Sequence, residues 1–289
     1  MANRPGAEID VTHSLVRDLV TGQFPELAKL PLTELSKGWD NTNLRLGDDH
    51  IVRVPHRQAA APLILHEQRW LPELSSRFDL PIPAPTHCGE STQDYPWHWS
   101  ITPWFEGAEA AGAELGDPAE TANLLGGFFS QLHQTAPTNA PPNPYRGGPL
   151  SGQADKFESR VNLLDTSVDQ AAVRSLFAAA CTAPVATDHV WLHGDLHARN
   201  MIVNDGRLSA IIDWGDICSG DRATDLAGAF MLVPAEISTV RELAGASDAD
   251  WERARGWAIY FAVMYLTMSD DDPVMMAIGE RLLDTLLTN

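Results

Sequence analysis

The sequence changes its hydrophobic periodicity near residue 106, and this change restricts the folds open to the chain. Before that point, short runs of alternating apolar and polar residues are separated by turn residues, which is typical of hairpin strands. Strands are expected over residues 32–36, 43–46, 51–55, 86–89 and 97–105. One helical stretch interrupts them, beginning near Pro62 and expected to end before Pro72.

After Gly107 the apolar residues recur mainly at the spacing of an amphipathic helix. Helical regions are expected over residues 118–134, 152–183 and 222–287. Short strands around a turn at Asp205-Gly206 separate the second helical region from the third. The pattern predicts an α+β protein with two lobes: a small antiparallel-sheet lobe over residues 1–106 and a larger, mainly helical lobe over residues 107–289.

The composition is that of a globular protein that needs no metal or disulfide to hold its fold. The chain has 289 residues, 44% of them hydrophobic, and three widely spaced cysteines. Twenty basic residues stand against 39 acidic ones, and the formal net charge of −19 disfavours a nucleic acid partner. The N-terminal region lacks the apolar core of a signal peptide, and no apolar run reaches the roughly 18 residues of a membrane helix. We therefore expect a cytoplasmic protein with no membrane partner.

One stretch, Trp191–Trp214, carries a pattern that fits phosphoryl transfer. His193-Gly194-Asp195 is followed by Asn200, and Asp213 ends the apolar run after the next turn. In such a pattern one carboxylate orients the acceptor hydroxyl, while an amide and a second carboxylate bind Mg²⁺ against the nucleotide phosphates. The four-residue spacing of His193 and His197 would also allow a zinc pair, but no third soft ligand follows at metal spacing, which favours ordinary hydrogen-bonded histidines.

The run H-x-D-x-x-x-x-N followed by Ile-Asp-Trp resembles the aminoglycoside phosphotransferase family of protein-kinase-like small-molecule kinases. The resemblance implies a protein-kinase-like two-lobe fold. It also implies that Asp195 is the catalytic base, that Asn200 and Asp213 bind magnesium, and that His193 braces the catalytic loop. His197 falls where protein kinases have a lysine facing the γ-phosphate, and it is expected to help there when protonated.

The resemblance extends to the residues expected to bind the nucleotide. Arg53 resembles the third-strand position at which kinases place a lysine on the α- and β-phosphates, and Glu67 resembles its helix partner. An arginine at this position is a departure from the kinase pattern, although its guanidinium can bind phosphate and carboxylate through separate N–H groups. Without the resemblance to this family, Arg53 would be interpreted as a solvated strand residue.

Three further segments complete the expected site. The loop 38–43 occupies the place of the kinase glycine-rich loop but has one glycine, so Asn41 and Asn43 must supply donors that backbone amides supply elsewhere; it could also be a polar hairpin turn. Thr102 and Trp104 lie where the connection between the lobes should receive adenine, although Trp104 could equally be a core aromatic. Asp225 resembles the family aspartate that supports the catalytic loop from a helix start, or it could cap its own helix.

These observations predict a phosphotransferase that moves the γ-phosphoryl group of ATP or GTP to a hydroxyl of an aminoglycoside-like antibiotic. Residues 101–289 hold 26 acids and 11 bases, so a cationic acceptor would be attracted. Within the same fold, the alternative acceptors are macrolides, choline, ethanolamine, homoserine and fructosamine. A nucleotide-binding protein without turnover is the alternative from another class.

Overall fold

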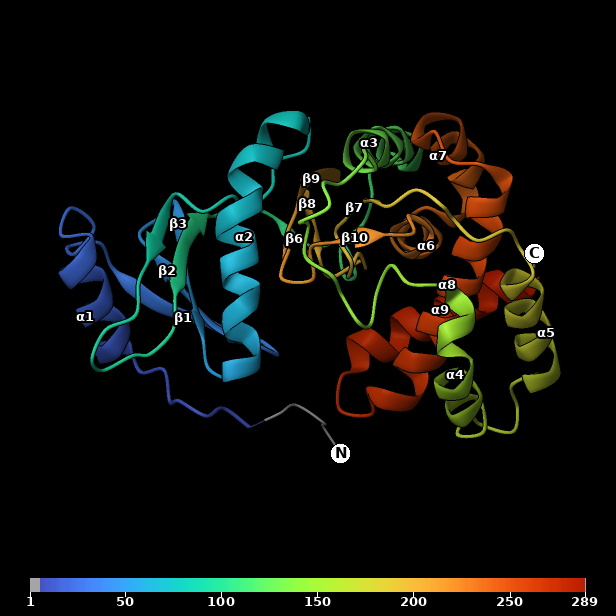
Figure 1. Ribbon diagram of the computed structural model, residues 1–289, viewed down its shortest axis with the longest axis horizontal. Coiled ribbons are helices and arrows are strands. Elements are labelled where there is room, and N and C mark those ends of the chain that lie inside the picture. The colour runs from blue at the N-terminus through green and yellow to red at the C-terminus, as the bar shows by residue number, and fades with distance from the viewer. Residues whose placement is uncertain (1–5, 289) are drawn as a thin grey trace. The chain divides into compact units, whose positions relative to one another are not determined.

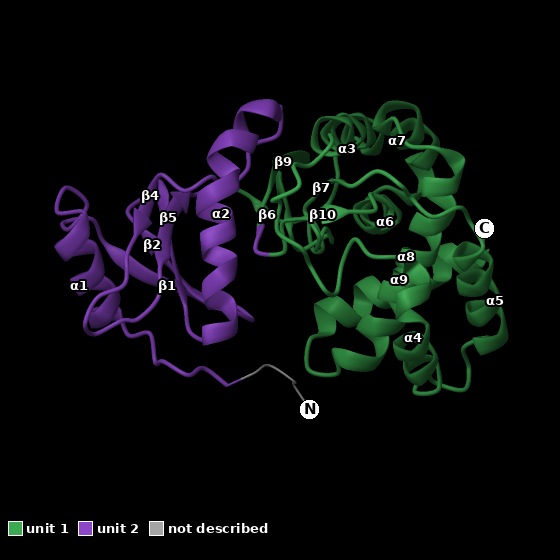
Figure 2. Cartoon of the chain, viewed as in Figure 1, with its two compact units in different colours: residues 1–3, 107–212, 216–289 green, residues 4–106, 213–215 purple. Residues whose placement is uncertain are grey.

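The computed structural model describes residues 6–288, and these divide into two compact units (Figure 2). The smaller unit contains the residues up to Glu106 together with 213–215. The larger unit contains 107–212 and the residues from Asp216 onward. The chain therefore changes units at residue 106, and a short segment from the later part of the sequence packs with the smaller unit.

The smaller unit is a five-stranded antiparallel sheet with two helices (Figure 1). Its elements are α1 (His13–Gln23), β1 (Leu32–Lys37), β2 (Asn41–Leu46), β3 (His50–Pro55), α2 (Ala61–Leu74), β4 (His87–Gly89) and β5 (Trp99–Pro103). The strand order is β1-β2-β3-β5-β4. The sequence analysis missed α1, which Thr12 caps by accepting a hydrogen bond from the amide of Leu15. Val16 and Val20 of α1 belong to the same buried cluster as Val52 of β3, so α1 covers one face of the sheet.

Helix α2 runs past the proline at which we expected it to end. Pro62 lies in its first turn, as predicted, but Pro72 lies inside the helix and the last helical residue is Leu74. Leu71 and Leu74 are both buried. The apolar face of the helix thus continues through Pro72, and burial of that face offsets the one backbone hydrogen bond that proline cannot donate.

The larger unit contains most of the helices and two small antiparallel sheets. Its strands are β6 (Ala108–Glu109), β7 (Val190–Leu192), β8 (Met201–Asn204), β9 (Arg207–Ile211) and β10 (Cys218–Gly220). Its helices are α3 (Pro118–Leu132), α4 (Ala154–Val161), α5 (Gln170–Cys181), α6 (Ala223–Leu232), α7 (Ile237–Ala244), α8 (Asp248–Met268) and α9 (Pro273–Thr288). Strands β6, β8 and β9 form one sheet, and β7 pairs with β10. The expected helical regions 152–183 and 222–287 are each divided into shorter helices, because turns interrupt them.

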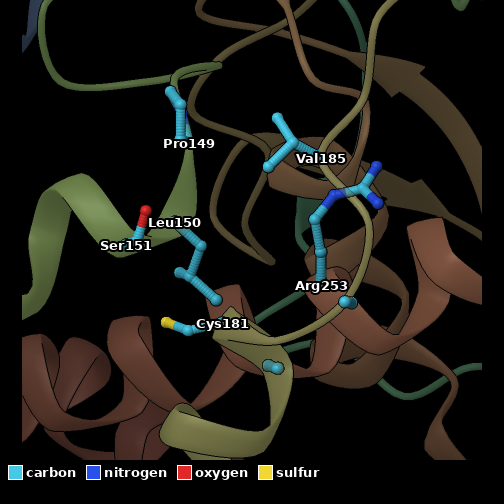
Figure 3. A pocket seen from close by; sticks show the side chains of 8 residues that line it. Pro149, Leu150, Ser151, Cys181, Val185 and Arg253 are labelled. Atoms are coloured by element: carbon cyan, nitrogen blue, oxygen red, sulfur yellow. The ribbon is translucent and has the colours of Figure 1, made fainter.

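Helix α8 is the centre of the larger unit and contacts α4, α5, α6 and α9 (Figure 1). A capping box formed by Ser247 and Asp250 starts it. Arg253 on its first turns is buried and donates to both carboxylate oxygens of Asp221, at 2.6 and 3.0 Å. The same side chain lines a small pocket with Leu150 and Cys181 (Figure 3).

Among the helices described for residues 6–288, none is both long and apolar enough to cross a membrane.

The proline-rich loop that precedes α4 packs against strand β10 through a contact between Gly147 and Gly220. The carbonyl oxygen of Gly147 accepts from the amide of Asp221 at 2.8 Å, and a Cβ atom at Gly220 would lie 2.4 Å from that oxygen. Gly147 itself has a φ of +70°, which favours glycine. The two backbones can approach this closely only because neither residue carries a side chain.

We expect Gly220→Ala to lower the free energy of unfolding by about 1–3 kcal/mol, because the added methyl group must push the two backbones apart. Gly127→Ala is the matched control, since a Cβ atom at Gly127 in α3 meets nothing within 4 Å. The control should be neutral or more stable by about 0.5–1 kcal/mol. Urea unfolding followed by circular dichroism measures both variants. Equal stability of Gly220→Ala and the unchanged protein would contradict the expectation.

Candidate active site

The loop between β7 and β8 carries His193, Asp195, His197 and Asn200 in the larger unit. It begins with a tight turn at Gly194, whose φ is +87°. A Cβ atom there would lie 2.4 Å from the carbonyl oxygen of Asp216, so only glycine fits without displacing the backbone. The turn brings the backbone of the loop against the strand β10 region before Asp195 is reached.

Asp225 in the first turn of α6 holds the start of this loop. Its fully buried carboxylate accepts hydrogen bonds from the amides of His193 and Gly194, at 2.8 and 2.9 Å. Asp225 does not cap its own helix, whose N-cap is Arg222. The structure therefore favours the expected support of this loop by Asp225. It does not show Asp225 capping α6.

His193 is buried and bridges two parts of the site. The amide of Asp195 donates to its Nδ1 at 3.2 Å, which indicates that the proton of the neutral ring is on Nε2. Nε2 lies 2.9 Å from the carbonyl oxygen of Ile212, to which it donates. The imidazole therefore joins the loop between β7 and β8 to the residue that follows β9, which is the geometry of a bracing residue.

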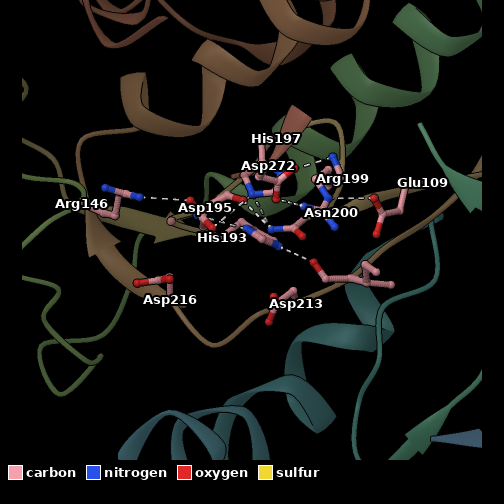
Figure 4. A network of polar contacts seen from close by, with 12 residues as sticks. Glu109, Arg146, His193, Asp195, His197, Arg199, Asn200, Asp213, Asp216 and Asp272 are labelled. Atoms are coloured by element: carbon pink, nitrogen blue, oxygen red, sulfur yellow. Dashed lines mark hydrogen bonds and ion pairs between the residues drawn. The ribbon is translucent and has the colours of Figure 1, made fainter. Parts of the chain in front are cut away.

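Asp195 has a basic side chain at each of its carboxylate oxygens (Figure 4). Nη2 of Arg146 lies 3.1 Å from Oδ1, and Nε2 of His197 lies 3.4 Å from Oδ2. Burial alone would raise the pKa of the Asp195 carboxyl, but the charges and hydrogen bonds of His197 and Arg146 outweigh it and hold that pKa well below its usual range. The carboxylate is accordingly ionised at neutral pH. His197 contacts Asp195, and its expected contact with the γ-phosphate stays a prediction.

Sequence reasoning missed Arg146 and also Arg199, the residue before Asn200. Arg199 donates to Glu109 of β6 at 2.8 Å and to Asp272, in the turn between α8 and α9, at 2.7 Å (Figure 4). It connects the loop between β7 and β8 to two segments that are distant in the sequence. No spacing pattern marks either arginine, so only the folded chain reveals these contacts.

In the smaller unit, Arg53 of β3 pairs with Glu67 of α2, as expected, at 3.1 Å between Nη1 and Oε1. Its Nη2 also donates to Oδ1 of Asp213 at 3.1 Å. Burial would lower the pKa of Arg53, but Glu67 and Asp213 more than offset it, and the pKa lies above its ordinary value. Asp213 has a φ of +60°, a strained backbone conformation for a residue other than glycine and one that occurs at functional sites. Arg53 is therefore a buried ion-paired residue rather than a solvated one.

The expected nucleotide contacts of the smaller unit lie on β2, on β5 and just after it. Asn41 begins β2 and is buried, and Asn43 lies opposite Arg53 in the β2–β3 ladder. Thr102 is buried near the end of β5. Trp104 is half-buried: the guanidinium of Arg45 lies 4.1 Å from its ring centroid, and its backbone amide donates to Asp49. A nucleotide-binding role for these residues stays a prediction.

The two expected magnesium ligands have oxygen donors of the right kind. Asn200 donates from its side-chain nitrogen to the carbonyl oxygen of Asp195 at 2.9 Å, which commits the nitrogen to the protein and leaves the side-chain oxygen as a ligand. Asp213 contributes a carboxylate, one oxygen of which accepts from Arg53. One amide oxygen and one carboxylate suit Mg²⁺, which takes the rest of its ligands from phosphate oxygens and water.

Comparison with known proteins places the chain among phosphotransferases. The family described as the phosphotransferase enzyme family matches residues 31–257. A comparison with curated protein sequences gave no significant match.

Three solved structures share the fold. The GDP complex of wild-type aminoglycoside 2'-phosphotransferase-IIIa is 19% identical, with a TM-score of 0.68, over 95% of this chain and 98% of that chain. The macrolide 2'-phosphotransferase MphH from Brachybacterium faecium is 19% identical, with a TM-score of 0.60, over 93% and 97%. The streptomycin–ATP–APH(2")-IIa ternary complex is 16% identical, with a TM-score of 0.60, over 94% and 95%. These likenesses confirm the expected α+β, protein-kinase-like fold.

We expect Asp225→Ala to lower the free energy of unfolding by about 1–3 kcal/mol for each of the two buried amides that lose their acceptor. Amide hydrogen exchange at His193 and Gly194 should become faster. Asp117→Ala is the matched control, because Asp117 also accepts from two backbone amides, those of Ala119 and Glu120, but at an exposed helix start. The control should lose about 1 kcal/mol. Equal, small losses in both variants would contradict a supporting role for Asp225.

Proposed function

Because the chain belongs to the phosphotransferase enzyme family, we propose that it is a small-molecule kinase that phosphorylates a hydroxyl group of an aminoglycoside-like antibiotic. The observation that carries the proposal is the ionised carboxylate of Asp195, held by Arg146 and His197 in a loop that Asp225 fixes. A carboxylate in that state can accept a proton from an alcohol as the alcohol becomes a nucleophile.

The transfer forms one bond and breaks one at the γ-phosphorus, and it moves one proton. The acceptor oxygen attacks the γ-phosphorus of ATP or GTP, while the hydroxyl proton passes to the carboxylate of Asp195. The bond between the γ-phosphorus and the oxygen that bridges it to the β-phosphate breaks, and that electron pair leaves with the nucleoside diphosphate. His193 and Asp225 hold the backbone on which Asp195 is carried.

In the proposal, Arg53 binds the nucleotide phosphates and Glu67 fixes the direction of its guanidinium. Asn41 and Asn43 contact the phosphates from the β2 region, and Thr102 and Trp104 contact adenine or guanine. Asn200 and Asp213 would hold Mg²⁺, which supplies positive charge against the phosphate oxygens when it is bound. The protein's own residues orient the donor and accept the proton.

The proposed acceptor is cationic. The excess of acidic residues after position 100 would attract a polyamine sugar, and a solved relative of the same fold contains streptomycin. A macrolide is the second candidate, because a macrolide 2'-phosphotransferase matches 93% of the chain in fold. We also propose a cytoplasmic location, where a nucleoside triphosphate donor is available.

The proposed function is tested by release of ADP or GDP with aminoglycosides, macrolides and metabolic alcohols as acceptors. We expect release to depend on an aminoglycoside. Asp195→Asn should lower kcat by ~10²-fold or more, because the amide cannot accept the proton, while the affinity for nucleotide changes little. Turnover near that of the unchanged enzyme in Asp195→Asn would rule out the assigned base. Nucleotide binding without release under any acceptor would favour a binding protein.

Arg53→Lys should lower kcat/KM for the nucleotide by ~10-fold or more, about 1.4 kcal/mol, because an ammonium group cannot replace the fork that reaches Glu67, Asp213 and phosphate together. Arg53→Ala should lose more. Arg69→Lys, on the same helix as Glu67, is the control and should have little effect. Steady-state kinetics with varied nucleotide measures all three variants. Unchanged kinetics in both Arg53 variants would show that another residue binds the triphosphate.

A further inference from the structure

Arg146 contacts the proposed catalytic base, although it comes from a loop that carries none of the family's motif residues. It lies in the proline-rich segment 137–149, forty-nine positions before Asp195. Its Nη2 donates to Oδ1 of Asp195 at 3.1 Å. His197 lies on the other oxygen of the same carboxylate. The guanidinium of Arg146 and the imidazole of His197 therefore set the rotation of the Asp195 side chain.

The position of Arg146 is itself fixed from three sides. The next residue, Gly147, donates its amide to Thr224 Oγ1 at 3.1 Å and accepts from the amide of Asp221 at 2.8 Å. The guanidinium carbon of Arg146 lies 5.2 Å from the ring centroid of Phe261 on α8. Asp221 after β10, Thr224 of α6 and Phe261 of α8 thus hold this part of the loop where the guanidinium reaches Asp195.

The hydrogen bonds of Arg146 differ from those of an arginine that only holds the fold together. Arg253 uses all three guanidinium nitrogens, on Asp221, Asp250 and the backbone of Ala249. Arg146 makes one side-chain hydrogen bond, to Asp195, and within residues 6–288 its buried Nε has no partner. Burial would lower the pKa of Arg146, but Asp195 and Asp216 more than offset that effect, so the side chain is charged. The one hydrogen bond of this half-buried guanidinium is thus made to the carboxylate of Asp195.

We propose that Arg146 is a positioning residue of the phosphoryl transfer: its guanidinium holds Oδ1 of Asp195, so that the carboxylate is presented in one orientation to the acceptor hydroxyl. The inference rests on the proposed function. Because Arg146 acts through Asp195, its loss should slow the transfer step and leave nucleotide binding almost unchanged.

The test compares kcat and the KM for nucleotide in Arg146→Met, Arg146→Lys and Arg146→Ala. We expect Arg146→Met to lower kcat by ~10²-fold, the effect of misplacing a reacting group by about 1 Å, with KM within about twofold of the unchanged enzyme. Arg146→Lys should recover part of the loss, and added guanidinium ion should recover part of the activity of Arg146→Ala. Thermal unfolding of each variant shows whether the fold is kept.

Arg241→Met is the matched control. Arg241 also pairs with a carboxylate, that of Asp248 at 2.6 Å, and lies 5.7 Å from an aromatic ring centroid, that of Trp251, but it is far along the chain from the motif. It should keep the kcat of the unchanged enzyme. A purely structural Arg146 would lower kcat only as far as it lowers stability, and guanidinium would restore nothing.

A double variant separates the two roles further. In an Asp195→Asn background, Arg146→Met should add little to the loss in kcat, because the residue through which it acts is already disabled. Full additivity of the two losses, or an unchanged kcat in Arg146→Met while the unchanged enzyme is active, would overturn the inference and leave the proposed function standing. If the unchanged protein releases no nucleoside diphosphate with any acceptor, the proposed function and this inference fall together.

Discussion

The buried carboxylate of Asp225 is the constraint on which the rest of the site depends. It accepts the amides of two successive residues, His193 and Gly194, in a part of the larger unit that excludes water. Without an acceptor these amides would be buried and unsatisfied, which is costly, so the chain can follow this path only beside α6. Once the path is set, Gly194 turns the backbone and the ring of His193 reaches Ile212. Asp195 is then carried on a backbone that has little freedom.

Arginine is used in one recurrent way in this acidic chain: a single guanidinium faces two carboxylates, at least one of which comes from another segment of the chain. Arg53 faces Glu67 and Asp213, Arg199 faces Glu109 and Asp272, and Arg253 faces Asp221 and Asp250. Such pairs add little net stability when they are buried, because desolvation of the charges offsets their attraction. They make the fold more specific, because a buried charge without its partner raises the free energy of any wrong arrangement. They therefore select one arrangement of loops around each part of the site.

Arg146 extends the same scheme to the proposed chemistry. Its negative neighbours are Asp195 and Asp216, and the first of these is the proposed base. In the proposal, an arginine so placed keeps the carboxylate of Asp195 ionised and sets its direction, and both effects are present before any substrate binds. Preorganisation of this kind means that the protein need not rearrange its charged groups during the reaction.

The sequence by itself determined the features that depend on local pattern or on residues close together along the chain. Alternation predicted the strands of the smaller unit, and the spacing of Asp195, Asn200 and Asp213 identified the loop and the strand end that carry them. The family resemblance predicted the pairing of Arg53 with Glu67, which the structure shows.

Only the tertiary structure decided the contacts made across long separations. Helix α1, the continuation of α2 through Pro72, and the partners of Arg146 and Arg199 depend on which surfaces pack together. Arg199 lies ninety positions from Glu109, and no periodicity connects residues so far apart. A hydrophobic pattern reports which face of a segment is buried but not what lies against it. The contacts of Arg146 with Asp195 and of Arg199 with Glu109 were for this reason visible only in the folded chain.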